Sequence, residues 1–222
     1  PAELGQKEEE KMIKLKELIE LRSMGYYKTK NEIKKKHRER INQRVTIWDE
    51  NLVVPKKLPP ENDSKLTMRE LKMLQKIKPN NDFVESGDDI KKSFMPLIEK
   101  HGVKVTEDFL SKILKESGKY IMELKYHYNR PRPYQVAEFY NLDLGENTLE
   151  SMKTPSYPSG HAVQGYLIGE YLSKLDPHNS KEYRQKGEDI AHSRLVAKAH
   201  YPSDKVYGKE IASHLATSMK KI

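Results

Sequence analysis

The sequence has 222 residues, 36% of them hydrophobic and 33% charged, with a formal net charge of +8. This length fits one domain of ordinary size, or a smaller domain with an extension. The pI of about 9.3 favours acidic ligands, such as phosphates, nucleic acid or an anionic surface, without choosing among them. The chain has no cysteine, which excludes disulfides, thiol catalysis and cysteine-ligated metals.

Two features bear on where the protein resides. No uninterrupted apolar run approaches the roughly 18–20 residues of a membrane span, so we expect a soluble protein. Residues 1–4 do not have the pattern of a signal peptide. The compartment itself is not determined: the cytoplasm or a larger assembly is favoured, and the periplasm stays open if a leader has been removed.

Residues 1–63 are predicted to form a charged N-terminal helix followed by an extended arm. Between residues 6 and 24, apolar residues recur at helical spacing, which predicts an amphipathic helix that needs a partner for one face. From residue 45 onward the helical period is lost and prolines gather, so we expect an extended arm with Trp48 as a docking anchor. Between these two parts lies a basic run, which is either a solvated helix face or a grip on a protein or nucleic-acid partner. The run consists of Lys28, Lys30, Lys34, Lys35, Lys36, Arg38, Arg40 and Arg44.

Residues 64–222 are predicted to form one helical domain. Thr67 and Glu70 make a capping-box pattern before apolar residues at helix spacing. Strand alternation is absent over any useful length, so the fold class is expected to be all-α. A long helical pattern begins at Thr106, with a break expected at Gly118. The other helical patterns cover residues 88–101, 160–175, 180–199 and 203–220, and residues 79–87 are expected to form a loop.

Two clusters contain residue types that bind phosphate. In the first, Lys125 is followed after six residues by Arg132, which lies between two prolines that restrict its backbone. Lysine supplies a compact charge, and arginine supplies a planar fork that matches phosphate oxygens. The second cluster, Pro-Ser-Gly-His at residues 158–161, directly precedes a predicted helix. Free N–H groups at a helix N-terminus bind anions, and a histidine there, His161, can give a proton to a leaving oxygen.

A third cluster contains Arg194, His200 and Asp204. Pro202 suits the first position of a helix, which places His200 at a helix junction and Asp204 in the first turn beyond it. A carboxylate there can fix the tautomer of the imidazole and leave the other ring nitrogen free to react. Taken alone, this stretch is equally well explained as a capped helix end.

Together the three clusters resemble the signature of the type 2 phosphatidic acid phosphatase superfamily. This family includes bacterial non-specific acid phosphatases, membrane lipid phosphatases and vanadium-dependent haloperoxidases. Its signature is a lysine, six residues and Arg-Pro; then Pro-Ser-Gly-His; then Ser-Arg, five residues, His, three residues and Asp. The sequence fills every position in order, over residues 125–133, 158–161 and 193–204. The resemblance covers about residues 66–222 and implies the helical bundle of the acid phosphatases and haloperoxidases.

The resemblance also implies a role for each matched residue. His200 would attack phosphorus and form a phosphohistidine, with Asp204 orienting it and stabilising its positive charge. His161 would protonate the leaving alcohol and then activate water. Since three fixed cations neutralise the charge, no metal or other cofactor is expected, although vanadate could occupy the phosphate site. The oxygens of the transition state would be held by Lys125, Arg132, Arg194 and the backbone N–H groups of Ser159 and Gly160.

The resulting prediction is a soluble, metal-independent phosphatase that hydrolyses phosphate monoesters, either of phosphorylated small molecules or of lipid-derived substrates. Two alternatives stay open. One is a vanadate-dependent haloperoxidase, which is disfavoured because those chains are generally much longer. The other is an assembly or structural component of a larger complex, because a catalytic core alone would not require residues 1–63. Homo-oligomerisation is left open.

Overall fold

A computed structural model describes residues 2–28, 33–145 and 149–220 of the chain. Residues 1, 30 and 221–222, which the predictions above include, lie outside these ranges. The described residues contain no strand, and the predicted all-α class is confirmed. The helices are α1 (Ala2–Ser23), α2 (Lys35–Ile41), α3 (Lys65–Lys76), α4 (Asn81–Ser86), α5 (Ile90–His101), α6 (Glu107–Tyr128), α7 (Pro133–Phe139), α8 (Gly160–Leu175), α9 (Ser180–Val196) and α10 (Pro202–Ser218), with short 3-10 turns η2 (Glu150–Met152) and η3 (Pro177–Asn179).

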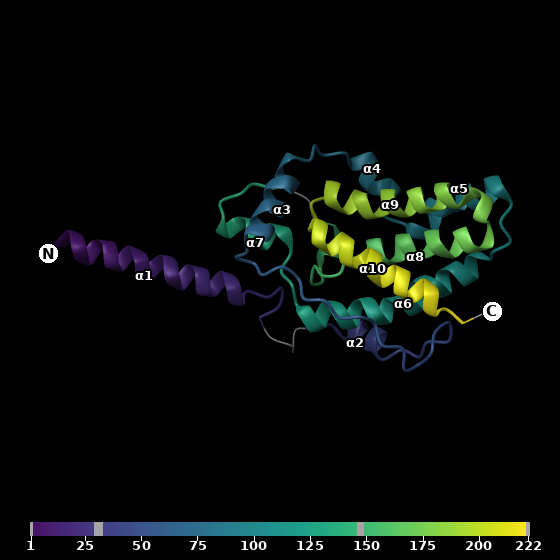
Figure 1. The fold of residues 1–222 in the computed structure, drawn as a ribbon, viewed down its shortest axis with the longest axis horizontal. Helices are drawn as coiled ribbons and strands as arrows, with labels where there is room; N and C mark the ends of the chain where they lie inside the picture. Colours follow the sequence, from purple (N-terminus) through teal and green to yellow (C-terminus); the bar gives the residue numbers. More distant parts are fainter. Residues whose placement is uncertain (1, 29–32, 146–148, 221–222) are drawn as a thin grey trace.

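Helix α8 packs against both α9 and α10 at the centre of the body (Figure 1). Apolar side chains of these three helices join those of α5 and α6 in one buried cluster. The approach of α9 to α8 is close: a Cβ at Gly187 would come within 2.7 Å of the carbonyl oxygen of Gly165. Only glycine allows that contact without a shift of the backbone. The packing fixes α8, whose N-terminus carries the second signature cluster.

Helix α3 begins two residues before the predicted capping box. Ser64 caps it by accepting a hydrogen bond from the N–H of Thr67, so Thr67 lies inside the first turn. Glu70 does not reach back to a cap, because its carboxylate bonds Ser203 near the third cluster. The pattern located the helix correctly and misassigned its capping residue.

Three further local predictions differ from the structure. The expected loop at residues 79–87 contains the short helix α4. Helix α6 continues through Gly118, which is buried against the side chain of Arg40 and does not interrupt the helix. Helix α9 ends at Val196, because Lys198 adopts a left-handed backbone conformation with φ of 54°. That turn places His200 in the connection to α10.

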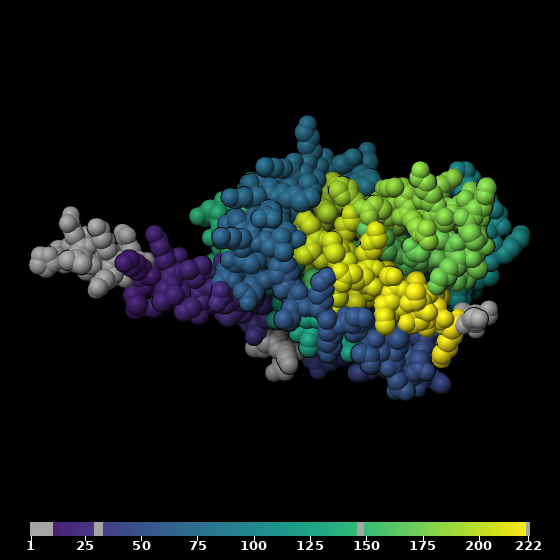
Figure 2. Space-filling view, viewed as in Figure 1, coloured from purple at the N-terminus to yellow at the C-terminus, as the bar shows by residue number. Residues whose placement is uncertain are grey.

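Helix α1 projects from one end of the body (Figures 1 and 2). It is anchored near its C-terminus, where Leu21 is buried in an apolar cluster with side chains of α3. The side-chain amide of Asn62 donates hydrogen bonds to the carbonyl oxygens of Leu21 and Met24. The apolar face expected for this helix is about half exposed, so its docking role stays a prediction. That face consists of Met12, Ile13, Leu15, Leu18 and Ile19.

Residues 45–54, which the sequence assigns to an extended arm, contribute to the core of the body. Trp48 is fully buried, packs edge-on against Tyr120 with a centroid distance of 5.8 Å, and donates from its indole to the carbonyl oxygen of Leu215 at 2.8 Å. The backbone N–H of Ile47 donates to the carboxylate of Glu116 at 2.9 Å. Trp48 is therefore an anchor within the fold, and this segment belongs physically with the helical body.

Replacing Trp48 should show how much stability this segment contributes. We expect Trp48→Ala to lower the free energy of unfolding by about 3–5 kcal/mol, because it leaves a cavity and an unpaired carbonyl. Urea unfolding followed by circular dichroism measures the loss. Val53→Ala is the matched control, since that side chain is 78% exposed, and it should change stability by less than about 0.5 kcal/mol. Equal stability of the two variants would contradict the assignment of Trp48 to the core.

Candidate active site

The three signature clusters meet around a pocket of about 250 Å³. Lys125 comes from α6, Gly160 and His161 come from the first turn of α8, and His200 comes from the connection between α9 and α10. Residues of α2 and of the segment 150–154 complete the lining. The fold thus brings together residues that lie far apart in the sequence.

Two neighbours fix the ring of His200. Its Nδ1 lies 3.1 Å from Oδ2 of Asp204, and its Nε2 lies 2.9 Å from Nη1 of Arg132. A guanidinium only donates, so Nε2 accepts and the ring proton resides on Nδ1, which donates to Asp204. Burial, followed by the charge of Arg132, holds the pKa of His200 well below its usual value. His200 is therefore neutral at neutral pH and carries a lone pair on Nε2, which is the form that a nucleophile needs.

Asp204 is fully buried and accepts several further hydrogen bonds. Its Oδ2 accepts from the hydroxyl of Ser156 and from the backbone N–H of Tyr201, while its Oδ1 lies 2.6 Å from Nη1 of Arg130. Burial opposes ionisation, but the charge of Arg130 and the hydrogen bond from His200 outweigh it and hold the pKa of Asp204 below its usual value. The carboxylate stays charged and can stabilise a positive imidazole.

Sequence reasoning did not identify Arg130 and Glu70 as part of this arrangement. Arg130 is 2% exposed and also lies 3.4 Å from a carboxylate oxygen of Glu70. Glu70 accepts hydrogen bonds from the N–H and hydroxyl of Ser203, at 2.6 and 2.8 Å. Arg130 lies in the first cluster, but spacing gives it no partner, and Glu70 lies 60 residues upstream of it. Only the fold reveals that both support Asp204.

Arg132 is held by backbone carbonyl groups. Its Nε donates to the carbonyl oxygen of Thr154, and Nη1 and Nη2 donate to those of Ala199 and Ser151, each at 2.7 Å. Burial lowers the pKa of Arg132 to about 10, so it remains charged at neutral pH. These bonds fix the plane of the guanidinium with Nη1 directed at Nε2 of His200.

Lys125 is the second cation near His200. It is 3% exposed, and its Nζ donates to the carbonyl oxygen of Pro155 at 2.5 Å. Burial and the charge of Arg132 hold the pKa of Lys125 well below its usual value, and Asp204 opposes the shift only in part. An anion bound beside Lys125 would favour its charged form.

At the N-terminus of α8, the backbone N–H of Ser159 is not free to bind an anion as expected. The hydroxyl of Ser159 caps the helix by accepting from the N–H of Ala162. The backbone N–H of Ser159 donates to the carbonyl oxygen of Asp204 at 3.2 Å, so it is engaged within the protein. The N–H of Gly160 has no acceptor among the described residues and lies at the first position of α8. The N–H of Gly160 is thus a backbone donor available to an anion in the pocket.

His161 and Arg194 share a partner, Asp88, in the connection between α4 and α5. Nη1 of Arg194 lies 2.9 Å from Oδ1 of Asp88, and Nε2 of His161 lies 3.1 Å from the backbone oxygen of the same residue. Arg194 is fully buried and does not line the pocket, whereas His161 does. Burial and the charge of Arg194 lower the pKa of His161 to about 4. His161 is therefore neutral at neutral pH in the free protein.

The buried charges at the site are not balanced. Arg130 is offset by Asp204 and Glu70, and Arg194 is paired with the exposed carboxylate of Asp88. Lys125 and Arg132, in contrast, are satisfied mainly by carbonyl oxygens, which accept hydrogen bonds but carry no full charge. Burying a charge without a counterion is costly, so this pair is arranged for an anion.

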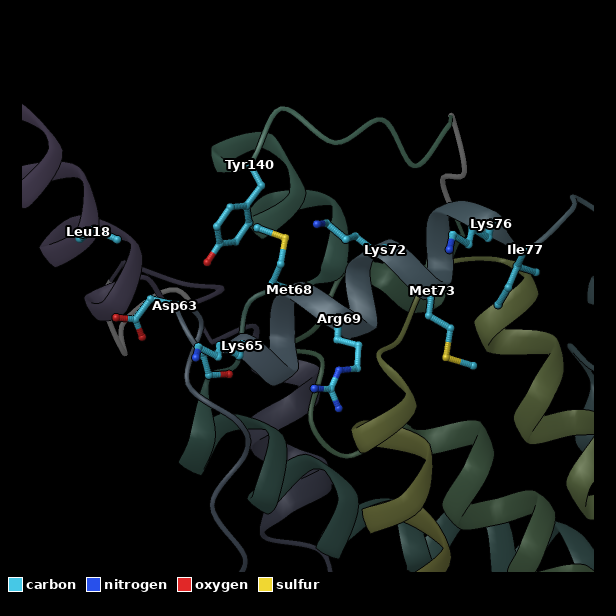
Figure 3. Close-up of a pocket in the computed structure, with 11 residues that line it drawn as sticks. Leu18, Asp63, Lys65, Met68, Arg69, Lys72, Met73, Lys76, Ile77 and Tyr140 are labelled. Atoms are coloured by element: carbon cyan, nitrogen blue, oxygen red, sulfur yellow. The ribbon is translucent and has the colours of Figure 1, made fainter.

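A larger cavity, of about 890 Å³, lies between α1, α3 and Tyr140 (Figure 3). Basic side chains such as Arg69 and Lys72 line it together with Met68 and Met73. None of its lining residues belongs to the three signature clusters. Chemistry, not size, selects the smaller pocket as the candidate active site.

The sequence of the region that holds these clusters matches a known family. Residues 109–221 match the PAP2 superfamily. The chain belongs to this family. The resemblance to the type 2 phosphatidic acid phosphatases expected from the three clusters is confirmed, and all three clusters lie inside the matched region.

Two curated acid phosphatases show the relationship within the PAP2 superfamily. The chain is 30% identical over 137 residues to the non-specific acid phosphatase of Salmonella typhimurium, covering 58% of this chain and 53% of that protein. It is 33% identical over 90 residues to an acid phosphatase of Zymomonas mobilis, covering 40% of this chain and 33% of that protein. The matches therefore span about half the length of the first relative and about a third of the length of the second.

The fold is shared with a solved structure. The crystal structure of a bacterial vanadium-dependent iodoperoxidase is similar with a TM-score of 0.51 and 18% identity, covering 77% of this chain and 53% of that chain. At this identity the likeness shows the fold alone. Within the described parts of the chain, no helix has the length and apolar character needed to cross a bilayer. The described residues also contain no group of three or more His, Asp or Glu side chains that could hold a metal ion.

The shifted histidines predict that acid destabilises the fold. The pKa of His161 is about 4 in the folded chain against 6.5 for the unperturbed group, so the unfolded chain binds more protons between these values. Lowering the pH from 7 to 5 should therefore reduce the free energy of unfolding by about 2 kcal/mol through His161 alone. His200 acts in the same direction, and Glu70, whose pKa is raised, acts against it.

Urea unfolding at pH 7 and pH 5 measures this loss, and a substitution isolates the contribution of His161. In His161→Gln the drop between the two pH values should be smaller by about 2 kcal/mol, because glutamine does not titrate. The contributions of His200 and Glu70 cancel in that difference. A variant with the full wild-type drop would show that His161 is not buried in the neutral form.

Proposed function

We propose that the chain hydrolyses phosphate monoesters through a phosphohistidine on His200, without a metal ion. The observation that carries this proposal is the state of His200, which is neutral, accepts a hydrogen bond from Arg132 at Nε2 and lines the pocket together with Lys125. The acid phosphatase relatives support the class of reaction. Fixed cations supply the neutralisation of developing charge that phosphoryl transfer requires.

In the first step, Nε2 of His200 attacks phosphorus while the bond between phosphorus and the ester oxygen breaks. When the substrate is bound, Nη1 of Arg132 donates to a phosphate oxygen instead of to Nε2 of His200. The lone pair on Nε2 is then free. Asp204, bonded to Nδ1, stabilises the positive ring that forms. His161 donates a proton to the leaving oxygen, and the alcohol departs. The negative charge of the bound phosphate raises the pKa of His161, which favours the protonated form that this step needs.

In the second step, water attacks the phosphorus of the phosphohistidine. His161, now neutral, takes a proton from the water. The bond between phosphorus and Nε2 breaks, and the electron pair returns to His200. Inorganic phosphate leaves, and the site returns to its starting state. Each proton given in the first step is recovered in the second.

The pocket volume bears on the substrate. A cavity of about 150 Å³ holds a benzene-sized molecule. The pocket of about 250 Å³ therefore accommodates a phosphate group and a small organic group. The long chains of a lipid-derived substrate would have to lie outside it. The volume favours a phosphorylated small molecule.

Vanadate has the shape and charge of phosphate, and Lys125, Arg132 and Nε2 of His200 fit it equally well. Bound there, it would supply the peroxide-dependent oxidation of halide that haloperoxidases perform. The sequence relatives are acid phosphatases, which favours ester hydrolysis. Vanadate is then expected to act as a competitive inhibitor of hydrolysis.

The nucleophile is tested with p-nitrophenyl phosphate in the presence of EDTA. His200→Ala should lose at least about a thousandfold in kcat, because no other group can form the covalent intermediate. His178→Ala is the control, since His178 is exposed and lies on the turn η3 away from the pocket. Activity of His200→Ala within tenfold of wild type would refute the phosphohistidine. Loss of wild-type activity in EDTA would refute metal independence.

The proton donor is tested by varying the leaving group. The kcat/KM of His161→Ala should fall at least tenfold more with phenyl phosphate than with p-nitrophenyl phosphate, because the poorer leaving group depends more on protonation. This parameter reports the steps up to loss of the alcohol, so the hydrolysis of the intermediate does not mask the effect. Equal losses with both substrates would assign His161 to binding alone.

A further inference from the structure

Part of the wall of the catalytic pocket comes from α2. Lys34, Lys36 and Arg40 line the same pocket as Lys125 and His200. These three residues lie far outside the region matched to the PAP2 superfamily, which begins at residue 109. The catalytic signature therefore does not account for them.

Helix α2 is held firmly on α6. Nδ1 of the buried His37 lies 2.5 Å from the hydroxyl of Tyr126, and the amide of Gln43 donates to the carbonyl oxygen of Lys115 at 2.7 Å. Arg40 lies over Gly118 so closely that a Cβ there would be 3.0 Å from its Cδ. The backbone of α2 therefore has a fixed position relative to α6, which also carries Lys125.

The segment before α2 is attached to the other wall of the pocket. The hydroxyl groups of Tyr26 and Tyr27 donate to the carbonyl oxygens of Met152 and Lys153, at 2.9 and 3.2 Å. The backbone N–H of Tyr27 donates to the side chain of Asn129, directly after α6. The segment that precedes α2 is thus tied to residues 152–153 and to the end of α6.

The pocket lining carries a large excess of positive charge. Glu150 is the carboxylate in the lining, and it is paired with Lys153 at 2.5 Å. No described carboxylate lies within ion-pair distance of Lys34, Lys36 or Arg40 (the described side chains are those of residues 11–28, 33–145 and 149–220). Burial, and then the charges of the α2 cations and of Lys125, lower the pKa of His37, which shows that these cations act on one region.

We propose that Lys34, Lys36 and Arg40 bind a second phosphate group of the substrate, while Lys125 and Arg132 bind the phosphate that is cleaved. The phosphate of a simple monoester is already neutralised by the cations at His200, so the α2 cations exceed what it requires. Glu150 lies close enough for its charge to interact with Lys34 and Lys36, but it is paired with Lys153. A second phosphate on a short spacer would supply a counterion that binds these cations directly. The substrate class is thus a small bisphosphorylated molecule, and naming one phosphate as the cleaved one rests on the proposed function.

Binding of non-hydrolysable ligands tests this inference without turnover. The probes are alkane-α,ω-bisphosphonates with spacers of two to five carbons, each compared with the alkylphosphonate of the same length, by calorimetry at 0.15 M salt. We expect wild type to bind at least one bisphosphonate about tenfold or more tightly than its partner, because a charge-assisted contact is gained. In Lys36→Ala and in Arg40→Ala this preference should fall to about threefold or less.

Lys35→Ala is the matched control. It removes one positive charge from the same helix, but Lys35 does not line the pocket, and its Nζ lies 3.9 Å from Glu39. It should keep the tenfold preference. Lys35, Lys36 and Arg40 are exposed, so their alanine variants should retain the unfolding midpoint of wild type. If Lys35→Ala and Lys36→Ala lost the preference for the bisphosphonate equally, the preference would depend on the overall positive charge of the helix. That result would overturn the proposal.

The two proposals fail in different ways. Wild type that shows no preference for any bisphosphonate, yet hydrolyses p-nitrophenyl phosphate, refutes the second phosphate subsite and leaves the phosphatase standing. Wild type that prefers a bisphosphonate, with the preference lost in Lys36→Ala, but hydrolyses no phosphate ester supports the subsite and refutes the reaction.

Discussion

The buried carboxylate of Asp204 accepts hydrogen bonds from four groups. They are the ring of His200, the backbone N–H of Tyr201, the hydroxyl of Ser156 and the guanidinium of Arg130. A buried carboxylate costs several kcal/mol unless charge and hydrogen bonds compensate it, so these neighbours are required by its burial. The backbone carbonyl of the same residue accepts from the N–H that precedes α8, which ties the second cluster to the third. The group that orients the proposed nucleophile therefore also holds the three clusters together. Its geometry cannot be changed without disturbing the packing of the first cluster against the connection between α9 and α10.

The cations of the site differ in how they are compensated, and this difference points to the ligand. Arg130 has two carboxylate partners, whereas Lys125 and Arg132 have carbonyl oxygens. Carbonyl groups satisfy the hydrogen bonds without cancelling the charge, so burial lowers the pKa of both residues. In the proposed reaction a bound dianion supplies the missing charge. It would also change the state of His161, which is neutral in the free protein and must be protonated to act on a leaving group. Binding and activation of the proposed proton donor would thus be coupled through one electrostatic field.

The sequence was sufficient to predict which side chains meet where their contacts are local. His200 and Asp204 lie four residues apart across the helix start that Pro202 marks, and the structure places them 3.1 Å apart. The sequence was insufficient where the partners lie far apart along the chain. The ion pairs of Arg130 span 60 and 74 residues, and no periodic pattern predicts them. The burial of Trp48 was missed for a related reason. An extended segment has no helical period, so its inward side chains cannot be told from docking anchors until the surface that they cover is known.

The attachment of α2 separates two properties along the chain. The proposed reacting groups lie within residues 109–221, but the wall of the pocket also includes residues that precede this region. One side of α2 lines the pocket and the other faces solvent. On one side Lys36 and Arg40 face the pocket, and on the other Lys35 and Glu39 lie within 3.9 Å of each other at the solvent surface. A helix used only to dock a distant partner would need no such division. Because α2 and Lys125 share α6 as their support, the backbone positions that carry the two sets of cations are fixed relative to each other, and we expect the site to select ligands by the distance between their anionic groups.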